Sequence, residues 1–182
     1  MINIIAKNNL CFLALLEMIL MDYTGIHYFS QEKLVDYFGV TMFKGQDSPY
    51  SRVTFTDNEK DVGVHVTDSK LNAFFLNTGI PLKAIHFPAN PFHSYPLDNY
   101  HTDRQIKLKY IIFTFSYGIL FNKPDLNELG HAALYKGEID NNNLIIYDPG
   151  PESAGDKVVD KINMYEAMWA RRGGLYCFIE EQ

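Results

Sequence analysis

Three residue types that together can activate a thiol occur in this chain, far apart in the sequence. Cys11 stands at the start of a long apolar run, directly after two asparagines. His131 follows Gly130 in "GHAALY", and Asp148 ends "IIYDPG". A nucleophilic thiol needs a base within hydrogen-bond reach and a third group that fixes the tautomer of that base. If the fold brings the three together, they predict a Cys–His–Asp catalytic site.

Cys11 precedes a stretch that favours a buried helix running to about Tyr23, with Asn8 or Asn9 available as its N-terminal cap. Apolar side chains recur at helical spacing at Leu13, Leu16 and Leu20. A thiol in the first turn of a helix lies near unpaired backbone N–H groups and the positive end of the helix dipole, which lower its pKa. The alternative is that Cys11 only packs, because cysteine is among the most buried residue types. The downstream histidine and aspartate favour the catalytic interpretation.

His131 and Asp148 flank a predicted β-hairpin whose turn is "DNNN", so both should lie near the same end of two adjacent strands. If His131 and Asp148 were directly opposite each other across the hairpin, the centre of the turn would lie near Ile139–Asp140. The turn residues "DNNN" favour a centre slightly later in the sequence. We therefore expect a bulge or a register adjustment between the two strands.

Among the histidines, only His131 opens a predicted strand that continues with two small residues. Ala132 and Ala133 leave room for a helix to pack closely, which a contact with Cys11 requires. The other histidines are expected on the surface or in loops, at His27, His65, His86, His93 and His101.

The pattern along the chain changes from helices to strands near its middle. A second helix is predicted from the cap Ser30 to Gly39 and a third from Thr67 or Asp68 to Gly79, with an irregular loop over Thr41 to Val66. Segments rich in β-branched and aromatic residues predict the strands "PLKAIHF", "IKLKYIIFTFSYGI", "HAALYKGEI", "NLIIYD" and "GLYCFIEE". A short helix, "INMYEAMWARR", precedes the last strand, and "FPANPFHSYPLDNYHTD" has too many prolines to be regular. This order predicts an α+β fold in which N-terminal helices pack on an antiparallel sheet.

Length and composition agree with one domain over residues 1–182, because a chain of this size buries roughly 70% of the surface of its unfolded form. The net charge of −6 and the scattered cations argue against a nucleic-acid partner.

The apolar run Leu10 to Met21 contains Glu17, is shorter than the ~20 residues of a membrane span, and is followed by no small-residue cleavage site. We expect a cytoplasmic protein without a membrane partner. Two cysteines and no CxxC or HExxH spacing predict reduced thiols, no metal site and no cofactor.

The order of a helix-borne cysteine, a strand-opening "GHAALY" and a strand ending "IIYDPG" resembles the C39-like branch of the papain-like cysteine peptidases. The segment "YFSQEKLVDYFGV" is similar to the second helix of that family. The resemblance covers most of the chain, more weakly from Thr41 to Val66 and from Phe87 to Lys107. It implies a papain-like fold, with Cys11 as nucleophile, His131 as general base and then acid, and Asp148 as the residue that orients the imidazole.

Two positions depart from the family pattern. The family usually places a glutamine about six residues before the cysteine to complete the oxyanion hole, where this chain has Ile5, and commonly a glycine after the cysteine, where this chain has Phe12. An amide from Asn8, Asn9 or Asn3 could replace the glutamine beside the backbone N–H of the cysteine. Losing one oxyanion donor typically slows turnover ~10²–10³-fold.

These residues predict a cysteine hydrolase, of the thiol-protease or amidase type, that cleaves a peptide or amide bond through an acyl-thioester. An acyltransferase that uses the same thioester, or an inactive binding domain that keeps the scaffold, remains an alternative. The expected partner is a peptide, a protein or a small amide. The loop Thr41 to Val66 and the segment Phe87 to His101 either border the cleft or serve as packing flaps.

Cys177 lies in "GLYCFIE", where strand alternation places it on one face with Leu175 and Ile179, and places Tyr176 and Phe178 on the other. We expect it to be an inert core thiol that forms no disulfide with Cys11.

Overall fold

The structure, a computed structural model, describes residues 1–89 and 108–180. Its helices are α1 (Cys11–Thr24), α2 (Gln31–Phe38), α3 (Asp68–Thr78), α5 (Tyr117–Leu120) and α6 (Lys161–Ala170), with single 3-10 turns η1 (Glu59–Asp61) and η2 (Pro124–Leu126). Its strands are β1 (Val40–Phe43), β2 (Val53–Thr56), β3 (Leu82–Pro88), β4 (Leu108–Ser116), β5 (Gly130–Glu138), β6 (Asn143–Asp148), β7 (Gly155–Asp160) and β8 (Gly174–Glu180).

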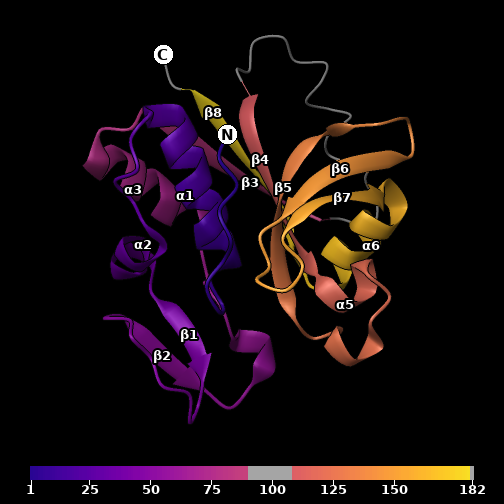
Figure 1. Cartoon of the computed structure of the whole chain (residues 1–182), viewed down its shortest axis with the longest axis horizontal. Coiled ribbons are helices and arrows are strands. Elements are labelled where there is room, and N and C mark those ends of the chain that lie inside the picture. Colours follow the sequence, from indigo (N-terminus) through magenta and orange to yellow (C-terminus); the bar gives the residue numbers. More distant parts are fainter. Residues whose placement is uncertain (90–107, 181–182) are drawn as a thin grey trace.

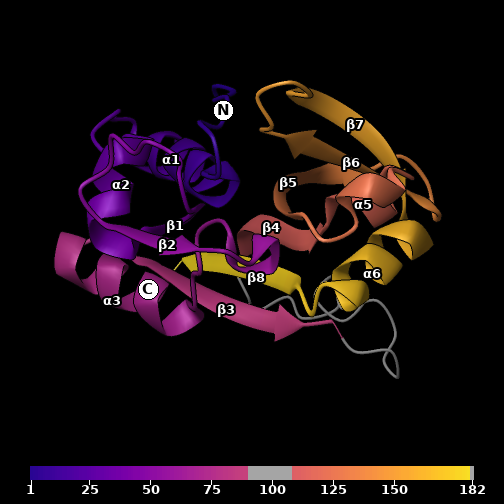
Figure 2. The same cartoon turned by 90° about the horizontal axis from the view of Figure 1, so that it is seen from below.

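The fold is mixed α+β, built on a six-stranded antiparallel sheet in the order β3-β8-β4-β5-β6-β7. Helices α1, α2 and α3 lie on one side of this sheet, and α5 and α6 lie on the other (Figures 1 and 2). The prediction of N-terminal helices against an antiparallel sheet that includes β5, β6 and β8 is confirmed.

The three N-terminal helices form where the sequence predicts them. α2 follows Ser30, and α3 follows Thr67, whose hydroxyl caps the helix by accepting a backbone N–H. Gly79 ends α3 in a left-handed conformation with φ of 68°, which glycine adopts without a steric penalty. The expected asparagine cap on α1 is wrong, because Leu10 occupies the cap position and no side chain caps the helix. Asn9 instead makes a left-handed turn with φ of 66° one residue earlier.

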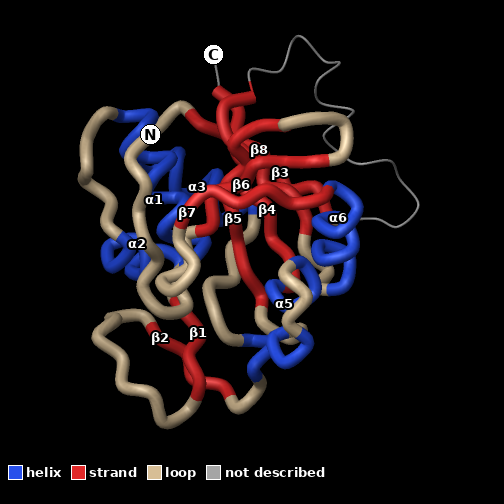
Figure 3. Tube along the Cα trace, turned by 45° about the vertical axis from the view of Figure 1, so that its right-hand side comes forward, coloured by secondary structure: helices blue, strands red, loops and turns tan. Residues whose placement is uncertain are grey.

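The predicted irregular loop over Thr41 to Val66 is wrong in part. Strands β1 and β2 pair in parallel there, set apart from the main sheet (Figure 3). Strand β7, at the edge of the large sheet, also went unpredicted. Both β2 and β7 are short and largely exposed. β7 has no regular apolar alternation, and the alternation of Val53 and Phe55 with threonines in β2 spans only four residues. The proline-rich segment after Phe87 lies almost entirely outside the described residues.

Helix α1 lies at the centre of one of the two hydrophobic cores. Leu13, Leu16 and Leu20 are fully or almost fully buried there, as predicted, and α1 packs against β5. It is 14 residues long, and no helix in the described ranges is both long and apolar enough to cross a bilayer.

The two small residues after His131 face opposite cores. Ala132 belongs to the core that contains α1, whereas Ala133 belongs to the core between the sheet and α6. Close approach of α1 to β5 therefore depends on Ala132, and the prediction that both alanines make room for this helix is correct for Ala132 alone. Alternation along β5 produces this difference, because successive side chains point to opposite faces of a sheet.

The β5–β6 hairpin contains the expected register adjustment. Leu134 pairs with Tyr147, but the register shifts between Tyr135 and Gly137, so that Lys136 is the extra residue of a bulge. Continuing the register from Leu134 places Asp148 opposite Ala133 rather than opposite His131. The two predicted catalytic residues are therefore diagonal neighbours on one face, a spacing that long side chains can span.

Candidate active site

The three predicted catalytic residues, Cys11, His131 and Asp148, lie together at one end of β5. His131 Nε2 lies 2.7 Å from Asp148 Oδ1. This leaves Nδ1 of the ring for the thiol, and Cys11 at the first position of α1 is close enough for a side-chain hydrogen bond with His131 to contribute to the pKa of each group. Each residue comes from a different element, so the site exists only in the folded chain.

Asp148 is completely buried and is held by three donors. Its Oδ1 accepts from His131 Nε2 and from the Gly150 N–H at 2.8 Å, and its Oδ2 accepts from the Ser153 hydroxyl at 2.7 Å. A Cβ at Gly150 would lie 2.6 Å from Ser153 Oγ and 3.0 Å from Asp148 Oδ1. Gly150 is thus needed for close packing around the carboxylate.

The His131 ring is fixed by its neighbours as well as by the carboxylate. Phe115, its partner on β4, and Tyr117 both meet the ring edge-to-face, with centroid separations of 5.7 and 5.1 Å. The His131 side chain keeps only 10% of its surface exposed. The imidazole can therefore exchange protons with a bound substrate while most of its surface is shielded from water.

Electrostatics favour an ion pair between Cys11 and His131. Burial acts to raise the pKa of the Cys11 thiol, but the His131 hydrogen bond and charge, with the backbone N–H groups of Ala132 and Phe12, lower it overall. Burial acts to lower the pKa of His131, but its bonds to Asp148 and Cys11 and the charges of both raise that pKa to about 10. A thiolate beside an imidazolium is a nucleophile at neutral pH.

Asp148 stays ionised for the same reasons. Burial alone would raise the pKa of its carboxyl, but the hydrogen bonds from His131, Ser153 and the Gly150 N–H and the charge of His131 lower it. A carboxylate held by several donors is poised to orient the imidazole and to stabilise its charged form.

The backbone that leads into Cys11 is tied down by Gln31, at the start of α2. This side chain is only 4% exposed, and it accepts from the Lys7 N–H at 2.8 Å and donates to the Ile5 carbonyl at 3.1 Å. The Ala6 N–H donates to the Pro149 carbonyl at 2.7 Å, which fastens the same segment to the turn after Asp148. The nucleophile and the carboxylate are thus held by one connected set of backbone contacts.

Of the amide donors predicted for the oxyanion hole, Asn8 and Asn9 line a hollow with Cys11 and His131. Asn3 is exposed and is not among the residues that line the cleft. Ile5, at the position where the C39-like pattern has a glutamine, is 57% exposed. The backbone N–H groups in the first turn of α1 have no intrahelical acceptor. The Phe12 N–H bonds to the Cys11 thiol, and the Cys11 N–H is the candidate oxyanion donor.

Cys11 and His131 lie between two hollows of about 400 and 430 Å³, which together form the cleft. Val62 and Gly63 line both hollows. The preceding turn, η1, is fastened by an ion pair of 3.0 Å between Lys60 and Glu128. Part of the 41–66 segment therefore borders the cleft, which was one of its two expected roles.

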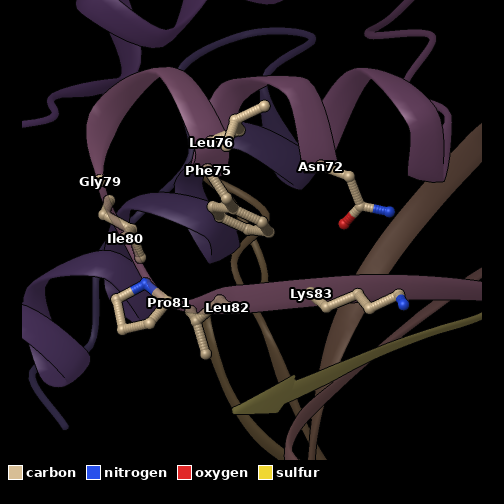
Figure 4. Close-up of a pocket in the computed structure, with 8 residues that line it drawn as sticks. All are labelled: Asn72, Phe75, Leu76, Gly79, Ile80, Pro81, Leu82 and Lys83. Carbon is tan, nitrogen blue, oxygen red and sulfur yellow. The ribbon is translucent and has the colours of Figure 1, made fainter. Parts of the chain in front are cut away.

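A further hollow of about 310 Å³ lies at the end of α3, away from Cys11 (Figure 4). Its lining is mainly apolar, with Phe75, Leu76 and Ile80 among the residues that surround it. The side-chain amide of Asn72, which also lines this hollow, donates to the Ala84 carbonyl at 3.0 Å and accepts from the Ala84 N–H at 2.7 Å. The residues that line this hollow include no cysteine, serine or threonine.

The remaining described histidines are not part of the Cys11–His131–Asp148 group, although His65 lines one hollow of the cleft. His27 is exposed but pairs with the buried Glu17, and His65 is exposed and contacts the Asp61 carbonyl at 2.6 Å. His86 is not in a loop, because it lies in β3 and stacks on Tyr176 at a centroid separation of 4.4 Å. His93 and His101 lie outside the described residues.

Both cysteines are free thiols. Cys177 is fully buried in the core on the α6 side with Leu175, while Tyr176 and Phe178 belong to the core on the α1 side. Burial raises the pKa of the Cys177 thiol to about 12, in agreement with the prediction of a core thiol.

Sequence reasoning missed Gly150, Ser153 and Gln31. The first two follow Asp148 in "DPGPES", and a serine a few residues beyond a strand-ending carboxylate is a weak signal for a hydroxyl that returns to it. Nothing in the pattern of α2 separates Gln31 from an exposed first-turn residue.

No group of three or more His, Cys, Asp or Glu side chains in the described part of the chain is arranged to hold a metal ion. No protein-family model, curated protein or solved structure matched the chain.

Proposed function

We propose that this protein is a cysteine hydrolase that cleaves a peptide or amide bond through an acyl-thioester on Cys11. One observation carries the proposal: the Cys11 thiol, with a lowered pKa, lies in a cleft beside a histidine that a buried aspartate holds. The resemblance of the "GHAALY" and "IIYDPG" motifs to those of C39-like peptidases, within the papain-like superfamily, supports the same assignment.

In the first half-reaction the Cys11 thiolate attacks the carbonyl carbon, so that an S–C bond forms and the carbonyl electrons move to oxygen. The intermediate collapses as the C–N bond breaks, and the His131 imidazolium gives its proton to the leaving amine. In the second half-reaction neutral His131 takes a proton from water, whose oxygen attacks the thioester. The C–S bond then breaks, a carboxylic acid leaves, and the thiolate–imidazolium pair returns.

The oxyanion would be met by backbone N–H groups at the start of α1 and by an amide of Asn8 or Asn9. These asparagines lie in the same hollow as the thiol. One missing donor slows acyl transfer by ~10²–10³-fold. Turnover of Asn8→Ala and Asn9→Ala proteins would identify the amide that contributes.

Labelling with iodoacetamide, located by peptide mapping, tests the activated thiol. An unperturbed thiol is well under about 1% ionised at pH 6. We expect Cys11 to be labelled readily at that pH in the native protein and much more slowly after His131→Ala. Equal, slow labelling of both proteins at pH 6 would overturn the proposal.

Cleavage itself is tested by incubating the protein with a mixture of peptides and identifying new termini by mass spectrometry. New termini should appear with the native protein and be absent with Cys11→Ala. Adding a small primary amine to the same reaction reports the acceptor: free carboxylic acids indicate hydrolysis, and amide conjugates indicate acyl transfer.

A further inference from the structure

Most of the charged side chains that line the cleft are cations, although the chain as a whole carries a net charge of −6. The charged residues that line its two hollows, His131 and His65 aside, are Lys7, Lys70, Lys123, Arg171, Arg172 and Glu152. Five positive side chains against one negative side chain is the reverse of the overall composition. The local field at the thiol is therefore not set by the net charge.

The cations fall into two groups of different character. In the hollow that contains Asn8 and Asn9, Lys7 pairs with Glu32 and Lys123 lies over the Tyr117 ring. Glu152 lines this hollow too. The Glu32 carboxylate offsets the charge of Lys7 and the Glu152 carboxylate offsets that of Lys123, so this hollow carries little net charge.

The other hollow, which we name the cationic half, is lined by Lys70, Arg171 and Arg172, with no aspartate or glutamate among its lining residues. Among the described residues none of the three forms an ion pair with a carboxylate. Lys70 Nζ contacts only the His65 carbonyl, at 3.3 Å, and Lys70 and Arg172 are exposed.

Arg171 brings this charge close to the catalytic residues. Its guanidinium packs over Gly130, next to His131, at a distance where a Cβ on that glycine would lie 2.9 Å from Nε and 3.0 Å from Nη2. One of its nitrogens donates to the Lys60 carbonyl, which fixes the side chain against η1. A fixed guanidinium has the planar geometry that binds a carboxylate through two hydrogen bonds.

Asp68, the acidic residue of α3, is the nearest carboxylate in sequence to Lys70. Its charge raises the pKa of Tyr176, which lines this hollow, but Asp68 does not line the hollow and forms no ion pair with the three cations in the described part of the chain. Unpaired cations beside a cleft attract anionic ligands and speed their association.

We infer that the cationic half selects peptide or amide substrates that carry a carboxylate side chain within one or two residues of the bond to be cleaved. This inference rests on the proposed function, because substrate selection requires that the protein cleaves a substrate. The electrostatic field at Cys11 and the binding of acidic peptides in the cleft can both be measured without turnover.

The ratio of the alkylation rates of Cys11 by iodoacetate and by iodoacetamide measures the field, because the two reagents differ in charge and form the same S–C bond with loss of iodide. The ratio at Cys11 should exceed that of a free cysteine peptide. At low ionic strength a charge about 10 Å from a thiolate changes such a ratio about two-fold in water. Removing two such charges with Lys70→Gln and Arg172→Gln should therefore lower the ratio by up to about four-fold at low salt. Arg171 is left in place because it packs against Gly130.

Lys136→Gln is the matched control. Lys136 is an exposed lysine in the β5 bulge, at the opposite end of the strand from His131, and it lines neither hollow of the cleft. Its loss should leave the ratio unchanged, and added salt should shrink the difference between the native protein and the double variant. A ratio at Cys11 equal to that of free cysteine, or one that the double variant leaves unchanged, would overturn the inference.

Protection from iodoacetamide measures binding of the acidic group itself. The probes are two acetylated, amidated hexapeptides, one alternating alanine with glutamate and the other alanine with glutamine. The glutamate peptide should slow labelling of Cys11 more strongly, and this advantage should vanish in the double variant. Equal protection by both peptides would overturn the inference. A thiol that proves unactivated at pH 6, but whose ratio and protection respond to these charges, would overturn the proposed function and support the cationic half.

Discussion

Replacing Asp148 with asparagine should lower the pKa of His131 while leaving the fold intact. The amide has the shape of the carboxylate, so its oxygen can still accept from the His131 ring and from the Gly150 N–H. Its nitrogen takes the place of Oδ2 and can donate to the Ser153 hydroxyl, which can act as an acceptor. The substitution therefore removes a charge and leaves every hydrogen bond a partner.

The size of the effect follows from the site. A full charge in contact with an ionisable group shifts its pKa by about 1–3 units, which is about 1.4–4 kcal/mol. The pKa of His131, raised to about 10 in the native protein, should fall by that amount. Because a raised histidine pKa adds stability that is complete below about 6.5 and is lost as the pH rises through the folded value, Asp148→Asn should lose this stability at a lower pH than the native protein.

Titration of the histidine ring protons by NMR measures the shift directly, with the His131 signal assigned by its absence in His131→Ala. Ser153→Ala is the control, since it removes one hydrogen bond to Asp148 but keeps the charge, and it should move the His131 pKa much less. If His131 titrates at the same pH with and without the Asp148 charge, the assignment of Asp148 as the group that holds the imidazolium is wrong.

Three further substitutions test the surroundings of the site. Cys177→Ala should lower the free energy of unfolding by about 1–2 kcal/mol in denaturant titrations and leave the labelling rate of Cys11 unchanged; slower labelling in a folded variant would contradict its role as core. Gly150→Ala should destabilise the protein by about 1–3 kcal/mol through overpacking against Asp148 and slow the labelling of Cys11 at pH 6; an unaltered rate and stability would show that the loop yields without cost. Gln31→Leu leaves two backbone groups without their partner and should destabilise by about 2 kcal/mol or more, and a thermal melt equal to that of the native protein would refute this.

The parts of the fold that the sequence predicts are those with a regular apolar period. α1, α2 and α3 carry helical spacing and clear stop signals at glycines, and β5, β6 and β8 are rich in β-branched and aromatic residues. β1, β2 and β7 escaped prediction, because short strands at edges owe their structure to neighbours rather than to their own pattern. The cap of α1 was also missed, since a left-handed Asn9 resembles a cap in sequence but not in geometry.

The candidate site divides in the same way. Residue type and order predict Cys11, His131 and Asp148, because the chemistry needs one of each. Gly150 and Ser153 follow Asp148 in one turn, but the sequence gives only a weak signal for their bonds to it. The cations of the cleft come from segments that only the tertiary structure brings to the site, such as Arg171 over Gly130, and no local pattern marks them.

The bulge at Lys136 explains why a diagonal arrangement serves this chemistry. The register near the turn, where Gly137 pairs with Ile145, would if continued set Asp148 opposite Leu134, which faces the core that contains α1. The shift at the bulge instead sets Asp148 opposite Ala133, on the same face as His131 and two residue pairs from direct opposition, where it is fully buried. The chain after β6 then turns back so that Gly150 and Ser153 bond to the carboxylate. Because a charge acts more strongly where water is excluded, a register that lets the fully buried Asp148 bond to His131 favours the imidazolium, and through it the thiolate of Cys11.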